Sequence, residues 1–235
     1  MKGLVALIPM KAHSERVPNK NIRDFCGKPL YHCILNVLLA CPYINAIYIN
    51  TDSEAISEDA ACYFKERVTI IFRPPAIRGD FMHTQQGFKP VDANILIEYD
   101  LSQVRGDYFL QTHSTNPLLK TSTVTKAIEA FFEDKAHDSL FSVTRIQSRF
   151  YDHRGNPVNH DPTEMLRTQD LPPVYEENSN LYIFSRASFN KYKRRIGENP
   201  ILFEMSRLEA VDIDDENDFR LAEYIYQCQH GIGAR

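Results

Sequence analysis

The sequence lacks paired cysteines at a C-x-x-C spacing and lacks any long apolar run. Its five cysteines form an odd set: Cys26, Cys33, Cys41, Cys62 and Cys228. Such a set argues against a disulfide framework and a structural zinc site, and favours free thiols in a reducing compartment. No apolar stretch approaches the roughly 20 residues of a transmembrane helix, and residues 3–8 run into Pro9 and a charged segment without a cleavage site. We expect a cytoplasmic protein with no membrane partner.

An excess of positive charge is also missing. The 27 Lys and Arg residues are outnumbered by 31 Asp and Glu residues, which gives a formal charge of −4 and argues against a nucleic-acid partner. The charge is nevertheless uneven. Residues 1–30 hold six basic and two acidic side chains, whereas residues 209–218 hold six acidic and no basic ones. One segment therefore suits a polyanion and the other suits a cation.

Short apolar runs alternate with amphipathic stretches, which is typical of a parallel sheet with crossover helices and predicts the α/β class. We expect strands at residues 4–8, 46–50, 68–72, 108–111 and 139–143. Helices are expected from Leu30, after a cap at Ser53, and at residues 91–99 and 123–132.

After Arg145 the sequence becomes polar and rich in Asn, Asp and Pro, which indicates an inserted loop or hairpin. A strand at residues 181–184, a helix at 188–195, a strand at 210–213 and a last helix from Glu216 are expected to follow. The interpretation is one domain over residues 1–235, with an insertion at about 146–195. Four aromatic residues of this part could lie in the core, which is favoured, or at an interface: Tyr182, Phe184, Phe189 and Tyr192.

The loop after the first expected strand carries three cations, Lys11, Arg16 and Lys20. Loops beyond the carboxyl ends of the strands form the ligand crevice of an open α/β sheet. Three neighbouring cations repel one another unless a multiply charged anion lies among them, and a triphosphate meets that requirement. The alternative is a solvated basic loop.

Two acidic residues near the other end of the chain, Asp212 and Asp214, alternate with Val211 and Ile213. In a strand this spacing places both carboxylates on one face, where their repulsion and burial would be relieved by a divalent cation such as Mg²⁺. The alternative is an acidic turn that caps the last helix. We interpret Asp215, Glu216 and Asp218 as acids of the helix N-terminus.

Six groups of residues occur in the order found in one enzyme family. They are Lys20-Asn21-Ile22 with Gly27-Lys28-Pro29-Leu30, Asn50-Thr51-Asp52-Ser53, residues 111–118 (QTHSTNPL), Ser142-Val143-Thr144, residues 167–172 (RTQDLP) with Tyr175, Glu177 and Asn178, and residues 211–214 (VDID) with Asp218-Phe219. Over almost its whole length the sequence resembles the acylneuraminate cytidylyltransferases, also called CMP-sialic acid synthetases. The resemblance implies a Rossmann-like, glycosyltransferase-A-like nucleotidyltransferase fold, with a mixed, mostly parallel sheet, flanking helices and a dimerisation insertion.

The resemblance also implies a reaction. The hydroxyl of an acidic 2-keto-3-deoxy sugar attacks the α-phosphorus of CTP, giving a CMP-sugar and pyrophosphate, with Mg²⁺ as cofactor in a homodimer. It assigns catalysis to Lys11, Arg16 and Lys20 and metal binding to Asp212 and Asp214. The nucleotide side comprises those three cations with Ser14, Asn21, Arg73, Asp80, Gln111, Ser114 and Thr115. The sugar side comprises Gln111, Arg167, Gln169, Tyr175 and Asn178, with Arg167 as the carboxylate clamp.

The sequence departs from the family pattern in the first loop and after Thr144. Lys11 replaces the usual Arg, Ala12-His13 replaces two glycines, and Arg145-Ile146 replaces a Pro and a Lys. Two alternatives therefore stay open: a nucleotidyltransferase for another acid acceptor or another nucleoside triphosphate, and a non-catalytic nucleotide-binding homologue. Simpler alternatives exist for two of the site residues. Arg73 could be a solvated residue after a strand, and Arg167 could form an ion pair that stabilises the insertion. The histidines, His113 among them, show no metal-ligand spacing.

Overall fold

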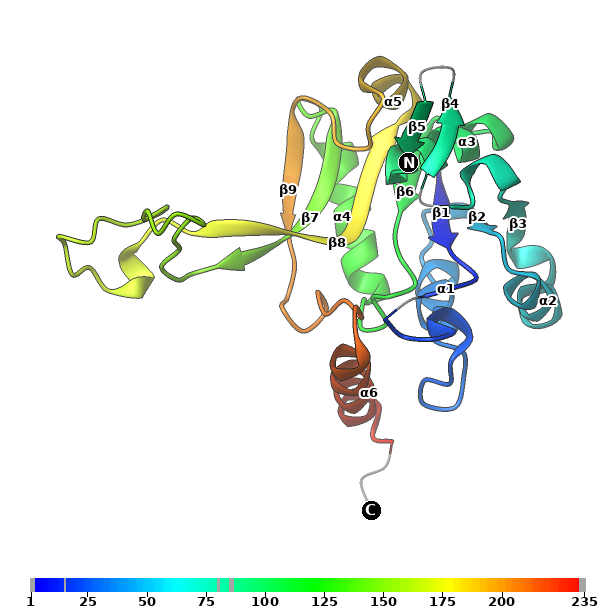
Figure 1. Cartoon of the computed structure of the whole chain (residues 1–235), viewed down its shortest axis with the longest axis horizontal. Helices are drawn as coiled ribbons and strands as arrows, with labels where there is room; N and C mark the ends of the chain where they lie inside the picture. Colours follow the sequence, from blue (N-terminus) through cyan, green and yellow to red (C-terminus); the bar gives the residue numbers. More distant parts are fainter. Residues whose placement is uncertain (1–2, 15, 80, 85–86, 233–235) are drawn as a thin grey trace.

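The computed structural model describes residues 3–14, 16–79, 81–84 and 87–232 (Figure 1). A seven-stranded sheet forms its centre, in the order β3-β2-β1-β6-β8-β7-β9. The strands are β1 (Leu4–Met10), β2 (Ile44–Thr51), β3 (Thr69–Phe72), β6 (Tyr108–Gln111), β7 (Ser139–Ile146), β8 (Val174–Ser185) and β9 (Pro200–Glu204). Only β8 runs antiparallel to its neighbours β6 and β7, so the other pairings in this sheet are parallel. The expected mixed, mostly parallel α/β sheet is confirmed.

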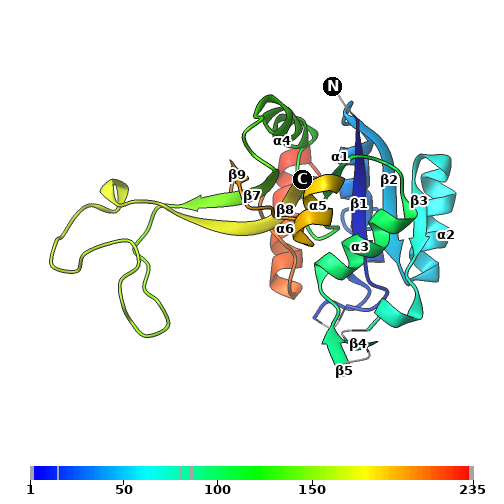
Figure 2. The ribbon, with the colours of Figure 1, turned by 90° about the horizontal axis from the view of Figure 1, so that it is seen from above.

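Helices cover both faces of the sheet, as Figure 2 shows from above. They are α1 (Tyr31–Leu39), α2 (Glu54–Tyr63), α3 (Ala93–Gln103), α4 (Thr121–Glu133), α5 (Arg186–Tyr192) and α6 (Glu216–His230). Because side chains alternate along a strand, Ala6 and Ile8 of β1 pack into a cluster with α1 and α4, whereas Val5 and Leu7 pack into a cluster with α3. Ser53 caps α2 as expected, accepting from the backbone N–H of Ile56. No helix among the described residues is long and apolar enough to cross a membrane.

The last helix, α6, packs on the segment that precedes α1. The ring of Phe25 lies edge-on to that of Phe219, with centroids 5.6 Å apart, and both side chains are buried. The guanidinium of Arg23 forms two hydrogen bonds to the Glu216 carboxylate, at 2.6 and 2.9 Å. These contacts bring the loop after β1 next to the acidic residues that precede α6.

One expected strand is absent, and three strands were not predicted. Residues 210–213 form no strand: the backbone there is extended, Ile213 is buried against Phe25 and Phe219, and its N–H donates to the carbonyl of Thr115. The alternation of apolar and acidic residues therefore reflects packing under α6 rather than a ladder. The edge strand is β9 instead, parallel to β7. A hairpin of β4 (Phe81–Thr84) and β5 (Gly87–Pro90) was not predicted.

Residues 147–173, between β7 and β8, project away from the body as an arm (Figures 1 and 2). The arm contains a bridge between Tyr151 and Pro157 and the short 3-10 helix η4 (Thr168–Asp170). After β8 the chain returns to the body, where α5 ends at Lys193 in a left-handed conformation with φ 56°. Residues 193–195 therefore form a turn, not the expected end of the helix.

Candidate active site

A cavity of about 490 Å³ opens where β1 and β6 end. Its walls include the loop after β1 and the loop after β6, as expected for the ligand crevice of an open α/β sheet, together with Asp52, Arg78 and Gly79. Seven of the residues predicted for the nucleotide side line it: Lys11, Ser14, Arg16, Lys20, Asn21, Ser114 and Thr115. Asp80, also predicted, lies outside the described residues.

Hydrogen bonds between loops hold the cavity walls together. Asn21 donates to the carbonyl of Lys11 at 2.9 Å and accepts from the Ser114 hydroxyl at 2.6 Å. The backbone N–H of Ala12 donates to Asp52 at 2.7 Å. Because Asn21 and Ser114 are buried and bonded to each other, they fix the shape of the walls, while the exposed cations Lys11 and Arg16 face solvent.

The cations of the first loop meet the acids that precede α6. Arg16 Nη2 lies 2.8 Å from Asp214 Oδ1, and Lys20 Nζ donates to the carbonyl of Ile213 at 2.5 Å. Burial lowers the pKa of Lys20, and the negative charges of Asp212 and Asp214 oppose that shift. The basic and acidic segments that the sequence places at opposite ends of the chain therefore form one site.

The environment of Asp212 and Asp214 disfavours two negative charges. Burial is the main cause that raises the pKa of Asp212; the charge of Asp214 adds to it, and a hydrogen bond from Thr115 opposes it. Asn116 lies 3.4 Å from Asp212 Oδ1. The two carboxylates are thus neighbours although the expected strand is absent. An added cation would lower the electrostatic cost of this arrangement.

Asp215 and Asp218 have a different task, as expected. Asp215 is the N-cap of α6 and accepts from the N–H groups of Asn217 and Asp218, while Asp218 accepts from the N–H groups of Asp214 and Asp215. No group of three or more His, Cys, Asp or Glu side chains that could hold a metal occurs in the described part of the chain. The pair of carboxylates on its own suits Mg²⁺, which binds one or two carboxylates and completes its shell with water and substrate phosphates.

Arg73 is buried, with 1% of its surface exposed, so the alternative of a solvated arginine is wrong. Its Nε donates to Asn50 Oδ1 at 2.8 Å, and its Nη2 donates to the carbonyls of Asn50 and Met10 at 3.2 and 3.4 Å. Asn50 in turn donates to Asp100 of α3 at 2.5 Å. Arg73 therefore joins the end of β1 to β2 and is not part of the cavity lining.

Two further residues near the cavity, His113 and Arg195, were not among the predicted site residues. His113 lines it, and burial, reinforced by the charges of Arg195 and Lys20, lowers the pKa of this imidazole to about 4. Arg195 donates to Gln111 Oε1 at 2.8 Å, which places a cation beside the last residue of β6. Arg195 sits in a run of charged residues, Lys191, Lys193 and Arg194 among them, and nothing in the sequence distinguishes it from these neighbours.

The residues predicted for the sugar side are dispersed within one chain. Arg167 and Gln169 lie on the arm, Arg167 directly before η4 and Gln169 within it, and Arg167, 73% exposed, bonds to Asp170 at 2.7 Å, as in the simpler alternative. Tyr175 is exposed at the start of β8. Asn178 is buried and bonded to Ser142 and Thr144. Gln111 alone of this set lies at the end of a central strand next to the cavity loops. Of the four aromatic residues considered for an interface, Tyr182, Phe184 and Phe189 are buried in the core.

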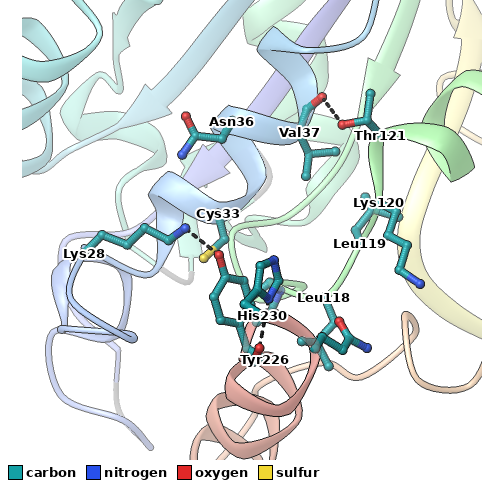
Figure 3. A pocket seen from close by; sticks show the side chains of 12 residues that line it. Lys28, Cys33, Asn36, Val37, Leu118, Leu119, Lys120, Thr121, Tyr226 and His230 are labelled. Carbon is teal, nitrogen blue, oxygen red and sulfur yellow. Dashed lines mark hydrogen bonds between the residues drawn. The ribbon is translucent and has the colours of Figure 1, made fainter. Parts of the chain in front are cut away.

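A second cavity, of about 530 Å³, lies between α1, α6 and the segment 117–121 (Figure 3). Lys28 reaches into it and donates to the Tyr226 hydroxyl at 2.7 Å, while the ring of Tyr226 stacks on that of His230. None of the predicted site residues that the structure describes lines this cavity. Its lysine therefore offers a control for the cations of the first cavity.

Comparison with known proteins finds relatives over almost the whole length of the chain. A family model described as cytidylyltransferase matches residues 5–230. The chain is 27% identical to a pseudaminic acid cytidylyltransferase of Campylobacter jejuni, covering 98% of each chain. It is also 27% identical to a CMP-N,N'-diacetyllegionaminic acid synthase of Legionella pneumophila, covering 95% of this chain and 96% of that one.

Solved structures share the fold. A CMP:2-keto-3-deoxy-manno-octonic acid synthetase complexed with CTP superposes with a TM-score of 0.67 at 13% identity, covering 97% of this chain and 100% of that one. A 4-diphosphocytidyl-2C-methyl-D-erythritol synthase from Anaerococcus prevotii gives a TM-score of 0.67 at 12% identity, covering 96% of each chain. The Rossmann-like nucleotidyltransferase fold implied by the sequence motifs is thereby confirmed.

Proposed function

This chain belongs to the cytidylyltransferase family, and from that membership we propose that it transfers the cytidylyl group of CTP to an acidic 2-keto-3-deoxy sugar of the nonulosonic class. The products are a CMP-sugar and pyrophosphate. Two of its relatives are named as enzymes of pseudaminic and legionaminic acid, and these names support this acceptor class. CTP and such sugars are the proposed partners, and the cytoplasm is the proposed compartment.

The observation that carries the proposal is that Lys11, Arg16 and Lys20 line one cavity, while Arg16 pairs with Asp214 and the charges of Asp212 and Asp214 act on Lys20. Both reactants are anions, so their approach is opposed by charge. Two unit charges 4 Å apart interact by about 4 kcal/mol at an effective dielectric constant near 20. Three cations around a triphosphate therefore supply enough attraction to bind it and to stabilise the departing pyrophosphate.

In the proposed reaction the sugar hydroxyl attacks the α-phosphorus in line with the bond to pyrophosphate. Asp212 and Asp214 would hold Mg²⁺, which when bound supplies positive charge to the phosphate oxygens. Arg16, which neutralises Asp214 in the unliganded protein, would exchange this carboxylate for a phosphate. His113, neutral at pH 7 because its pKa is about 4, adds no charge and can form hydrogen bonds to either reactant.

We propose that the protein is a homodimer in which the arm completes the partner's site. The arm carries exposed apolar side chains, including Met165, which is 92% exposed, together with Tyr151, Val158 and Leu166. Exposed apolar groups on a projecting element favour contact with another protein surface. Arg167 and Gln169 extend away from their own cavity, so a second chain is the natural place for them to contact the sugar.

The proposal is tested by measuring pyrophosphate release with each of the four nucleoside triphosphates. The acceptor panel comprises pseudaminic, legionaminic, N-acetylneuraminic and 2-keto-3-deoxyoctonic acids. We expect turnover with CTP and at least one nonulosonic acid, and at least 100-fold less with ATP, GTP and UTP. Turnover with another triphosphate, or only with 2-keto-3-deoxyoctonic acid, would favour a nucleotidyltransferase for another nucleoside triphosphate or another acid acceptor. CTP binding without turnover of any acid would favour a non-catalytic homologue.

A further inference from the structure

Arg195 is held by three neighbours at the end of the central strands. Its Nη1 donates to Gln111 Oε1 at 2.8 Å, and its guanidinium carbon lies 3.4 Å from the centre of the Tyr182 ring. Its Nη2 lies 3.7 Å from Glu177 Oε1, and the Tyr182 hydroxyl donates to the same carboxylate at 2.5 Å. Only 16% of the Arg195 side chain is exposed. A guanidinium this buried is costly unless it is stacked and paired, and here it is both.

The backbone brings Arg195 to this position. The left-handed residue Lys193 ends α5 and turns the chain back toward the sheet. The backbone N–H of Arg195 then donates to Asn94 Oδ1 of α3 at 3.2 Å. Its neighbour Arg194 instead forms an exposed ion pair with Glu198. Two adjacent arginines therefore differ completely in burial and partners.

The contact with Arg195 decides which way the Gln111 amide faces. A guanidinium has only donors, so the atom of Gln111 that it bonds must be the carbonyl oxygen Oε1. The amide nitrogen Nε2 then faces away from Arg195. This Nε2 is buried and has no hydrogen-bond partner among the described residues. A buried donor without an acceptor is unfavourable, and a substrate oxygen would satisfy it.

The position of Gln111 agrees with such a contact. Gln111 is in register with Leu7 of β1, and side chains two residues apart on a strand share a face. Pro9, two residues after Leu7, lines the cavity, and so does His113, two residues after Gln111. Gln111 itself is buried and is not part of the cavity lining; its amide lies two residues before the lining residue His113 and next to β8, the strand from which the arm extends.

We propose that Arg195 is a positioning residue, which locks the Gln111 amide so that Nε2 donates to an oxygen of the acidic sugar. Glu177 and Tyr182 of β8 contact the same guanidinium, so Arg195 connects β8 to Gln111 of β6. The inference rests on the proposed function for the identity of the acceptor. The orientation of the amide does not depend on it.

The orientation is tested on the unliganded protein by NMR. The side-chain NH2 signals of Gln111 are assigned by their loss in Gln111→Glu, which keeps an acceptor for Arg195. We expect one sharp pair of signals in the wild type and in Arg194→Met, the matched control. In Arg195→Met the pair should broaden or double, because the amide can rotate. An unchanged pair in Arg195→Met would overturn the proposal.

The role in the reaction is tested by steady-state kinetics with the acid that the wild type uses. We expect Arg195→Met to lower kcat/KM for the acid at least 10-fold with the KM for CTP unchanged, Arg195→Lys to recover part of the loss, and Arg194→Met to have no effect. Gln111→Leu/Arg195→Met should be no worse than Gln111→Leu, because Arg195 acts through Gln111. Additive losses, or an equal rise in both KM values, would overturn the assignment.

Failure of the proposed function would appear differently. A wild-type protein that turns over none of the acids contradicts the proposed function, whereas the NMR comparison of Arg195→Met with Arg194→Met still decides whether Arg195 orients Gln111. Melting temperatures of the variants separate a loss of folding from a loss of positioning. A folded Gln111→Glu variant that keeps full kcat/KM for the acid would show that the Nε2 donor is not used.

Discussion

The guanidinium of Arg16 lies 2.8 Å from the carboxylate of Asp214, although 198 positions separate the two residues in the chain. The contact joins the loop after β1 to the segment before α6. It is exposed on both sides and therefore contributes little to stability. Its significance lies in the placement of charge: the cations that line the cavity, and that suit a polyphosphate, lie next to acids that suit a metal.

The acid pair and the adjacent helix cap can be separated by mutation. We expect Asp212→Asn and Asp214→Asn each to lower kcat at least 100-fold and to raise the Mg²⁺ concentration needed for half-maximal rate, because each removes one carboxylate ligand. Asp215→Asn is the matched control, since Asn caps a helix as well as Asp does. Full activity of Asp214→Asn at low Mg²⁺ would contradict the proposed metal site.

The cations of the first loop should act on CTP rather than on folding. We expect Lys11→Met to raise the KM for CTP at least 10-fold, equivalent to about 1.4 kcal/mol, and Lys11→Arg to restore most of it because the charge is kept. Lys28→Met is the control, because Lys28 lines the other cavity (Figure 3). An equal effect of both Met variants would show that the cavity of about 490 Å³ is not the CTP site.

The sheet could be predicted from the sequence where strands are short, apolar and followed by amphipathic helices. The first half of the chain meets that condition, so β1, β2, β3 and β6 were located correctly. The strand β9 was missed, because Ile201 to Phe203 follow a turn-rich segment and pair at a sheet edge. Residues 210–213 were misassigned, because burial of Ile213 under α6 produces the same alternation as a strand.

For the site, the sequence motifs identified the residues of the loops after β1 and β6. The motifs did not predict contacts that depend on which side chains become buried. Arg73 reads as a charged residue after a strand, and only the packing of α3 and β2 shows why it is enclosed. Arg195 is one of several charges after α5, and the turn at Lys193 that directs it to Gln111 has no signature such as glycine.

Removal of the exposed apolar side chain at position 165 tests the dimer. We expect the wild type to have the mass of a dimer by light scattering, and Met165→Asp to shift it toward monomer, because burying a carboxylate in an interface is unfavourable. Leu221→Asp, which places the same charge on the exposed surface of α6, is the control. A monomeric wild type would rule out an arm that completes a partner's site.

Mixing of variants tests whether the arm acts across the dimer. We expect Arg167→Met and Lys20→Met homodimers to be nearly inactive, because one lacks the clamp for the sugar and the other lacks a cation for the phosphates. A mixed dimer has one site in which both residues are intact and one site that lacks both. Each mixed dimer should therefore have about half of the activity of a wild-type dimer. No recovery after verified subunit exchange would place Arg167 and Lys20 in the same chain's site or remove Arg167 from it.

The buried carboxyl of Asp100 should make stability depend on pH. Asp100 accepts a hydrogen bond from Asn50 within the core, and burial raises its pKa to about 7, with that hydrogen bond and Arg73 opposing the shift. The folded state therefore holds the proton more tightly than the unfolded state, whose Asp pKa is about 3.9. The contribution of Asp100 is most favourable below pH 4 and is lost as pH rises through 7.

Urea unfolding at pH 5 and pH 8 measures this dependence. A proton that only the folded state holds changes the free energy of unfolding by about 1.4 kcal/mol per pH unit. Between pH 5 and pH 8 the free energy of unfolding of the wild type should therefore fall by about 2–3 kcal/mol more than that of Asp100→Asn. The amide that this substitution introduces has no proton to lose and still accepts from Asn50. Glu98→Gln on the exposed face of the same helix should keep the wild-type slope, since Glu98 pairs with Lys193 at the surface. Equal slopes for the wild type and Asp100→Asn would mean that Asp100 is ionised throughout, with Arg73 compensating its charge, so that the core near β1 contains an ion pair rather than a protonated acid.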